Sequence, residues 1–241
     1  MLIKSGRVDD ARAFVLHSYP YSETSLIVDA FTREHGRLPL MARGARRPRS
    51  ALRGVLLGFQ PVLLAWSGRS EVRTLVRAEW VGGVPRLAGD GLLCGFYVNE
   101  LVMCMLARED AHEALYDDYA EAITRLAALE PPEPILRWFE KRILAEAGYA
   151  VLLEHEATTG DLIDPAASYT YDPERGPILL TRPGSTELVV PGTALIALAA
   201  DRYDDPASLA HAKAIMRTLV QYRLEHRPIR SREVLRELQR L

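Results

Sequence analysis

LIVDAFTREHGRLPLMA, residues 26–42, holds two short apolar runs, Leu26–Phe31 and Gly36–Ala42, separated by polar residues. Runs of this length, bounded by polar or glycine-containing turns, are typical of β-strands. Three more runs of the same character lie at Arg12–His17, Gly58–Trp66 and Val72–Trp80. The pattern therefore predicts five short strands within residues 1–82.

Five strands at this spacing predict a small barrel. A five-stranded Greek-key barrel of about this size is the OB-fold, whose exposed face and loops commonly bind oligonucleotides. A fragment of a β-sandwich or an SH3-like barrel would give the same pattern, so the spacing leaves those alternatives open. We expect residues 1–82 to form an OB-fold nucleic-acid-binding domain.

From Leu87 onward, the apolar residues recur with the period of a helix, as in Leu93, Phe96, Tyr97, Leu101, Cys104 and Met105. The pattern predicts a second helix that begins at Asp110, which has the spacing of a capping box with Glu113. A break at residues 130–134 precedes a third helix at 135–147, and the three form a bundle. Further helices are expected at 192–200, 206–225 and from 231.

Residues 149–190 are punctuated by Gly and Pro, which indicates a loop-rich insertion with room for one hairpin. The whole chain is therefore predicted to be an α+β protein. An N-terminal OB-fold barrel is followed by a helical domain at residues 83–241, which contains the irregular insertion.

The charge of the chain is unevenly distributed, although its net charge is only −2. Residues 1–80 carry 13 Lys plus Arg against 7 Asp plus Glu, a net charge of +6, whereas residues 81–241 have a net charge of −8. A second basic region, with a net charge of +5, runs from Lys213 to Leu241. A phosphate-facing module joined to an acidic scaffold would show this asymmetry, and ordinary surface arginine is the alternative explanation.

The most pronounced local feature is RGARRPRSALR, residues 43–53, which holds five arginines and no acid. Guanidinium groups match phosphate oxygens with paired donors, and Gly44 and Pro48 favour a loop from which several side chains reach one nucleic-acid backbone. A solvated loop that binds nothing is the alternative. The predicted DNA-binding residues are Arg37, Arg43, Arg46, Arg47, Arg49, Arg53, Arg69 and Arg73.

Proteins that bind single strands usually add aromatic side chains on which bases stack. Phe59, Trp66 and Trp80 fit the strand patterns better as core residues, whereas Tyr19 and Tyr21 flank Pro20 in a turn where they can be exposed. Backbone charge is therefore expected to dominate binding, with tolerance of sequence and strandedness and with strong salt dependence.

The sequence contains none of the common nucleotide-binding or hydrolase motifs, GxxxxGKS/T, GxGxxG, HExxH or GxSxG. We expect no cofactor and no enzymatic activity. The nearest approach to a metal or acid–base cluster is Glu154-His155-Glu156 with Asp161 and Asp164, which leaves a metal-dependent nuclease as an alternative function.

Cysteine use and hydropathy indicate the cellular compartment. Cys94 and Cys104 fit neither a disulfide framework nor a C-x-x-C metal site. The longest apolar runs are far shorter than the roughly 20 residues of a membrane-spanning helix, and the first residues lack a basic-then-apolar leader. We therefore expect a cytosolic protein without a membrane span.

A series of short motifs runs through almost the whole chain. The first half contains AFVLHSYPYSETS at residues 13–25, FT at 31–32, GR at 36–37 and ARGARR at 42–47. The second half contains YVNEL at 97–101, PEP at 132–134, LRWFE at 136–140, GY at 148–149 and SRE at 231–233. In this order they resemble the bacterial RecO family.

The resemblance implies an OB-fold that binds single- and double-stranded DNA and anneals complementary strands. It also implies cooperation with RecR to load RecA onto DNA coated by single-stranded-DNA-binding protein, in the bacterial cytoplasm at the nucleoid. Many members hold zinc with four cysteines after the helical bundle. This sequence has no cysteine between Gly148 and Pro191, so we expect a zinc-free insertion.

The helical region of the family captures the acidic, hydrophobic C-terminal tail of single-stranded-DNA-binding protein, which requires a basic residue beside an apolar pocket. Arg137, in the matched LRWFE stretch, is the predicted basic residue, and Leu153 is predicted to line the pocket. The alternative is that Arg137 pairs with Glu133 or Glu140 on its own helix. A protein-docking scaffold with weak DNA affinity is the second functional hypothesis.

Overall fold

The computed structural model describes residues 6–149, 151–181, 188–225 and 227–238. The chain forms two compact units, Met1–Glu130 together with Ile229–Leu241, and Pro131–Pro228. Within the described ranges, no helix combines the length and the apolar character that a membrane span requires.

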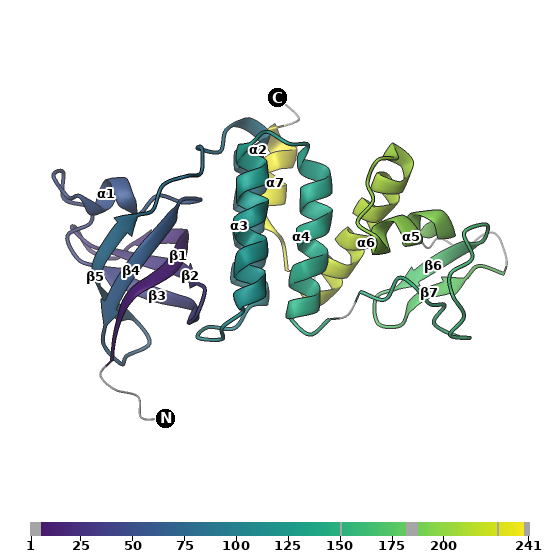
Figure 1. Ribbon diagram of the computed structural model, residues 1–241, viewed down its shortest axis with the longest axis horizontal. Helices are drawn as coiled ribbons and strands as arrows, with labels where there is room; N and C mark the ends of the chain where they lie inside the picture. The colour runs from purple at the N-terminus through teal and green to yellow at the C-terminus, as the bar shows by residue number, and fades with distance from the viewer. Residues whose placement is uncertain (1–5, 150, 182–187, 226, 239–241) are drawn as a thin grey trace. The chain divides into compact units, whose positions relative to one another are not determined.

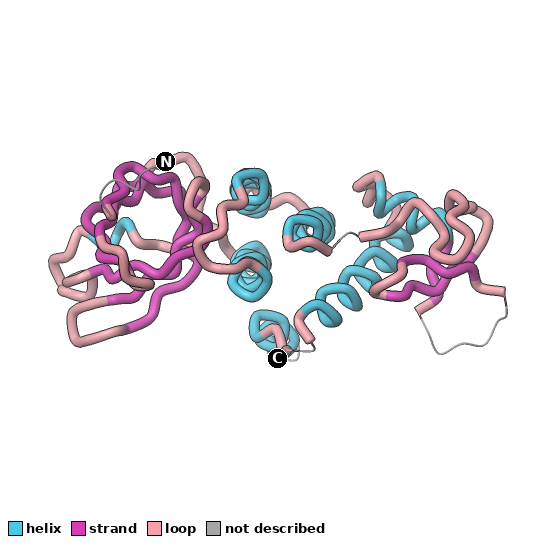
Figure 2. Tube along the Cα trace, turned by 90° about the horizontal axis from the view of Figure 1, so that it is seen from below, coloured by secondary structure: helices cyan, strands magenta, loops and turns pink. Residues whose placement is uncertain are grey.

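Five strands close into a barrel in the first unit, in the order β1-β2-β3-β5-β4. Figure 2 shows this barrel as a ring. Neighbouring strands are antiparallel except β3 and β5, which run parallel. The strands are β1 (Arg7–Pro20), β2 (Leu26–Thr32), β3 (Gly36–Ala42), β4 (Pro61–Ser67) and β5 (Arg73–Trp80). This barrel confirms the expected OB-type fold.

The barrel core consists of side chains that alternate along the strands. Val28 and Ala30 on β2 and Leu38 and Leu40 on β3 are completely buried, as the two-residue period of a strand requires. Trp80 was expected in this core, but it is 60% exposed. Trp80 is the last residue of β5, and it pairs with β4 on one side only. The pairing of β5 with β3 is confined to Arg73 and Thr74 at the other end of the strand, so within the described ranges β3 does not extend beside Trp80.

Besides the short helix α1 (Leu52–Val55), the unit of the barrel contains the helices α2 (Gly89–Met105), α3 (Glu113–Ala127) and α7 (Arg230–Leu238). The helix α2 contacts both α3 and α7, and α3 lies in front of α2 in the view of Figure 1. Phe14 and Phe31 of the barrel pack against Tyr116 and Tyr119 of α3, with ring centroids 4.9–5.8 Å apart. This aromatic cluster joins the barrel to the helices.

The predicted capping box at the start of α3 is wrong. The helix begins at Glu113 after His112, and no side chain caps it. The residues before it are instead tied to the barrel, because Glu109 N donates to the Arg37 carbonyl at 2.9 Å. A Cβ on Gly36 would lie 2.0 Å from the Asp110 carbonyl oxygen. The backbone of this segment therefore packs against β3 at a position where only glycine leaves enough space.

The second unit contains α4 (Pro132–Glu146), α5 (Gly192–Ala199) and α6 (Pro206–Arg223), with α6 packed on both other helices. It also contains a sheet of order β7-β6-β8, formed by β6 (Ser168–Asp172), β7 (Gly176–Leu179) and β8 (Val189–Pro191). The β6–β7 hairpin confirms the hairpin expected in the insertion. Asp205 caps α6 as its Asp-Pro sequence predicts, accepting from Ser208 N at 2.8 Å.

The consecutive helices α2, α3 and α4 are divided between the two units, since α2 and α3 pack in the first and α4 in the second. The boundary expected after residue 82 falls within the first unit. The division into residues 1–82 and 83–241 therefore stays a prediction about which parts of the chain fold independently.

Candidate nucleic-acid interface

The arginine-rich segment, residues 43–53, leaves β3 in consecutive turns and enters the short helix α1 (Leu52–Val55). Its backbone path is fixed by bonds from Arg47 N to the Gly44 carbonyl at 3.1 Å and from Ser50 N to the Arg47 carbonyl at 3.0 Å. Ala45 is completely buried in the barrel core, whereas the arginines on either side of it are exposed. The segment is therefore an anchored loop that presents cations outward.

The turn between β1 and β2 supports this segment. Arg46 N donates to the Thr24 carbonyl at 2.9 Å, and Arg46 Nη1 donates to the Ser22 carbonyl at 2.5 Å. Tyr21 on the same turn is 60% exposed, and Tyr19 just before it is 44% exposed, as their positions beside Pro20 allowed. The arginine-rich segment is thus bonded to the β1–β2 turn, which carries the exposed ring of Tyr21 and follows that of Tyr19 at the end of β1.

Six of the eight predicted DNA-binding arginines are exposed, and none of the six forms an ion pair with a described acidic residue. Phosphate binding requires guanidinium groups whose donors are not already occupied by carboxylates. The six residues are Arg43, Arg46, Arg47, Arg49, Arg53 and Arg69.

The other two predicted residues have internal partners. Arg37 Nη2 donates to the Leu106 carbonyl at 3.2 Å, and Arg73 Nη2 lies 2.7 Å from Glu109 Oε2. Their side chains are only 12% and 19% exposed. Both therefore fasten the barrel to the segment that follows α2, and a DNA contact by either one stays a prediction.

Arg33 has a similar role that the sequence did not reveal. Its guanidinium lies 2.5 Å from Glu113 and 2.9 Å from Asp117 on α3. The hydrogen bond from Arg33 lowers the pKa of the Asp117 carboxyl. Because these acids follow Arg33 by 80 residues or more, no local pattern could have indicated the pair.

The carboxylates at residues 154–164 stabilise turns. Glu156 accepts from Thr158 N at 2.8 Å, Thr159 N at 2.5 Å and Leu179 N at 3.3 Å. Burial by itself would raise the pKa of Glu156, but these backbone donors lower it to about 2. In the described ranges, no three His, Cys, Asp or Glu side chains are placed to share a metal ion. The nuclease hypothesis therefore lacks the geometry it needs there.

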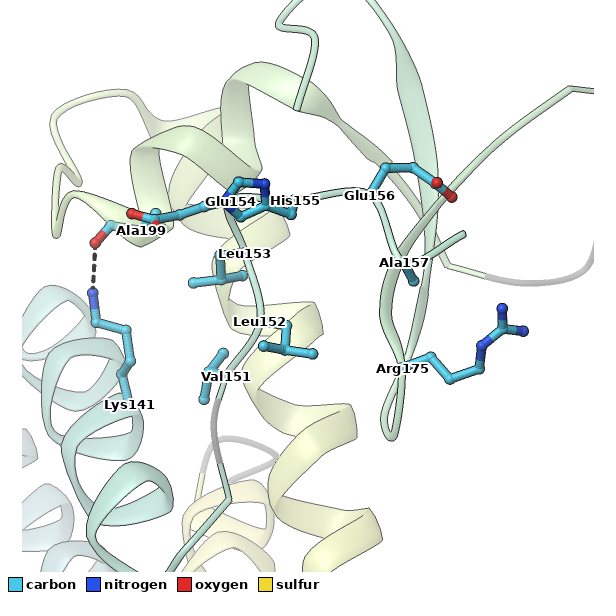
Figure 3. Close-up of a pocket in the computed structure, with 10 residues that line it drawn as sticks. All are labelled: Lys141, Val151, Leu152, Leu153, Glu154, His155, Glu156, Ala157, Arg175 and Ala199. Atoms are coloured by element: carbon cyan, nitrogen blue, oxygen red, sulfur yellow. Dashed lines mark hydrogen bonds between the residues drawn. The ribbon is translucent and has the colours of Figure 1, made fainter. Parts of the chain in front are cut away.

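A pocket of about 400 Å³ lies in the second unit and is shown in Figure 3. Val151, Leu152 and Leu153 form its apolar wall, with Lys141 on one side and Arg175 on the other. Lys141 Nζ is occupied, since it donates to the carbonyls of residues 198 and 199 at 2.9 and 3.0 Å and pairs with an acid at 2.6 Å. Arg175 is exposed, with no described side-chain partner, so it is the free cation beside this pocket.

Arg137 is not among the residues that line this pocket, whereas Leu153 is. The Arg137 side chain is 3% exposed, and its Nη2 donates to Glu140 Oε1 at 2.8 Å. The structure therefore contains the intrahelical pair that was the alternative to partner binding. A role for Arg137 or Leu153 in binding a partner stays a prediction. Arg175 escaped the sequence argument because a single arginine in a turn carries no recognisable pattern.

Comparison with known proteins extends the description to both units. Residues 9–84 match the family model for the recombination protein O N terminal, and residues 86–233 match that for the recombination protein O C terminal. The DNA repair protein RecO of Dechloromonas aromatica (strain RCB) is 48% identical over 239 residues, covering 98% of each chain. The DNA repair protein RecO of Polynucleobacter asymbioticus is 50% identical over 241 residues, also covering 98% of each chain.

Proposed function

The chain belongs to the RecO family of DNA repair proteins, and we propose that it is a recombination mediator that binds single- and double-stranded DNA and anneals complementary strands. In this proposal it also acts with RecR to load RecA onto DNA coated by single-stranded-DNA-binding protein. It works in the cytoplasm at the nucleoid, without a cofactor or a catalytic step.

The arginine-rich segment carries this proposal. It is anchored through Ala45 and through the bonds of Arg46 to the β1–β2 turn, so its exposed arginines extend from one fixed loop of the barrel. Annealing requires that the charge of two phosphate backbones be neutralised, and it requires no nucleotide hydrolysis. Arginines bind phosphate oxygens without reading bases, which suits a protein that must act on any sequence.

The pocket of Figure 3 supports the proposed docking of a partner tail. An acidic, apolar peptide needs an apolar wall with a free cation beside it. Val151, Leu152 and Leu153 supply the wall, and Arg175 supplies the cation. We therefore add Arg175 to Arg137 and Leu153 as a proposed contact for the tail of single-stranded-DNA-binding protein.

The experiment that tests DNA binding is a salt series with a fluorescent single-stranded oligonucleotide. It compares the wild type with the triple variant Arg46→Ala, Arg47→Ala, Arg49→Ala. Each phosphate contact contributes about 0.7 to the slope of log affinity against log salt for single strands, so three lost contacts should make the slope shallower by about 2. Between 50 and 200 mM salt, the advantage of the wild type should therefore shrink by roughly 20-fold.

A matched control removes the same charge elsewhere, with Arg86→Ala, Arg125→Ala and Arg202→Ala in one protein. This control should keep the wild-type slope. Equal slopes for the wild type and both triple variants would contradict the proposal and favour the scaffold hypothesis. Efficient annealing by the wild type without any partner would count against that scaffold.

A further inference from the structure

A second cleft, of about 540 Å³, lies within the first unit between the barrel and the helices α2 and α7. Its lining includes His17 and Tyr19 of β1, Phe96 and Met103 of α2, and Val234 of α7. Its volume is in the range of pockets that hold small organic groups. The arginine-rich segment contributes no residue to this cleft, so the proposed phosphate contacts do not account for it.

Two aromatic rings are exposed in the cleft. Tyr19 is 44% exposed and Phe96 is 47% exposed, although Phe96 was expected on the buried face of its helix. Each ring is held edge to face by a neighbour, Tyr19 by His17 at 4.4 Å and Phe96 by Phe59 at 5.2 Å. Such support fixes the orientation of a ring and leaves it able to receive another flat group.

The cleft also contains a polar pair with unused hydrogen-bonding capacity. Asp29 is 4% exposed, and its Oδ1 lies 3.6 Å from Arg37 Nη1, which is too long for a hydrogen bond. Asp29 Oδ1 and Arg37 Nε are both buried without a hydrogen-bond partner. One acceptor and one donor are therefore unsatisfied side by side. After a small rotation of these side chains, a planar group with a donor next to an acceptor would satisfy both.

The charges around the cleft favour a nucleotide over an acidic peptide. Arg37, Arg108 and Arg230 line the cleft together with Tyr19. Burial and the charge of Asp29 raise the pKa of Tyr19, although the charges of these three arginines act to lower it. Arg230 has no described ion-pair partner for its guanidinium. The buried Asp29 carboxylate would repel a carboxylate that entered the cleft, whereas a neutral base with phosphates at its edge avoids that repulsion.

We propose that this cleft captures one unpaired nucleobase of a single-stranded nucleic acid. The base packs against the rings of Tyr19 and Phe96 and turns its Watson–Crick edge toward Asp29 and Arg37, while Arg230 receives an adjoining phosphate; Arg108 also lines the cleft but is paired with Glu71. Every base carries a donor next to an acceptor on that edge, so the capture tolerates any sequence. A paired base cannot enter, so the cleft confers a preference for single strands.

The cleft lies near the arginine-rich segment that is proposed to bind the phosphates. The inference rests on that proposed function. Tyr19 precedes Ser22 by three residues, and the Ser22 carbonyl accepts from Arg46. Three extended residues span at most about 11 Å. A single strand that lies along the arginine-rich segment can therefore place a base near Tyr19.

The test compares three nucleic acids of equal length: a single strand, the same backbone with abasic sites throughout, and a duplex. Stacking of one base contributes about 1–3 kcal/mol, so the wild type should prefer the base-bearing strand over the abasic strand by roughly 5- to 150-fold. Tyr19→Leu and Phe96→Leu keep apolar volume but lose the ring. Each should reduce that preference at least about fivefold and leave binding of the duplex and the abasic strand unchanged.

Leu129→Ala is the matched control, because Leu129 is 77% exposed in the same unit and does not line the cleft. It should keep the wild-type preference. An unchanged preference in both leucine variants overturns the inference and indicates a protein partner for the cleft. If the wild type binds none of the three nucleic acids, the proposed function itself fails. If it binds all three equally with normal salt dependence, only the base-capture inference fails.

A second measurement does not depend on affinity. A strand that carries 5-iodouracil is irradiated with the wild type, and the crosslinked residues are identified by mass spectrometry. Crosslinks to Tyr19 or Phe96 support base capture in the cleft, and crosslinks confined to other residues overturn it.

Discussion

Replacing Arg137 by Met should strongly destabilise the second unit, whereas replacing Arg137 and Glu140 together by Met and Leu should not. The two side chains are 3% and 0% exposed, and the nitrogen and oxygen that join them are 2.8 Å apart. The single substitution removes the Arg137 guanidinium from a buried ion pair, which costs about 3–5 kcal/mol. The double substitution removes both charges, and its effect should lie between neutral and about 1–4 kcal/mol of added stability.

Urea denaturation followed by circular dichroism measures this difference. With a slope of about 1–3 kcal/mol/M, a loss of about 4 kcal/mol lowers the urea midpoint by about 1–4 M. Glu140→Leu alone should cost as much as Arg137→Met, because it leaves the buried guanidinium uncompensated. The two single effects together should therefore greatly exceed the effect of the double variant.

The reasoning would be refuted if each single substitution cost less than about 1 kcal/mol and the two effects added in the double variant, since the pair would then behave like a surface salt bridge. The double variant also separates the two roles considered for Arg137. If the stable double variant still binds the acidic tail peptide, Arg137 serves the structure of α4. If binding is lost while Arg175→Ala retains it, Arg137 contacts the peptide directly.

Four further substitutions test other parts of the structure. Asn99→Leu should destabilise the first unit by about 2–5 kcal/mol in urea titrations, and Tyr119→Phe by about 1–3 kcal/mol, because the amide bonds both the Leu16 carbonyl at 2.8 Å and the tyrosine hydroxyl at 2.6 Å. Gly36→Ala should lower the melting temperature clearly, since φ is +65° and its Cβ would lie 2.0 Å from a carbonyl oxygen of Asp110. Glu156→Gln should remove an acid-dependent contribution: folding lowers this pKa from 4.5 to about 2, so the stability that the carboxylate adds is complete above pH 4.5 and is lost as the pH falls toward 2. The difference in urea midpoint between wild type and Glu156→Gln should accordingly shrink over that interval, and a constant difference would contradict the assignment.

The elements of the fold could be predicted where the signal is local. The strands at Leu26–Thr32 and Gly36–Ala42 follow from short apolar runs bounded by polar or glycine-containing turns, and the start of α6 follows from the Asp205 cap with its adjoining proline. The prediction for Trp80 failed, because the strand pattern gives the direction of a side chain but not whether another strand continues beside it. The predicted capping box at Asp110 was also wrong. The backbone of Asp110 lies against Gly36 of β3, and the helix begins only at Glu113.

The candidate site could be predicted only in part, for a related physical reason. Residues 43–53 are a basic loop because Gly, Pro and Arg favour that conformation locally. Whether the guanidinium of an arginine is available to bind phosphate depends on acceptor groups that are distant in the sequence. Arg37 and Arg73 meet residues 69 and 36 positions away, and these contacts exist only in the folded barrel. The open cleft beside α2 depends on the same tertiary arrangement.

The number of arginines whose guanidinium groups are not paired with acids sets an upper limit on the electrostatic part of DNA binding. Of the ten arginines between residues 33 and 77, four form ion pairs with described acids, namely Arg33, Arg37, Arg73 and Arg77. The remaining six can neutralise at most six phosphates, which corresponds to a slope no steeper than about −4 for single strands and about −5 for duplex DNA. A measured slope within those limits is what contacts by the six barrel arginines alone would give. A steeper slope requires further cations, such as Arg230 beside the cleft and other residues of the basic region from Lys213 to Leu241.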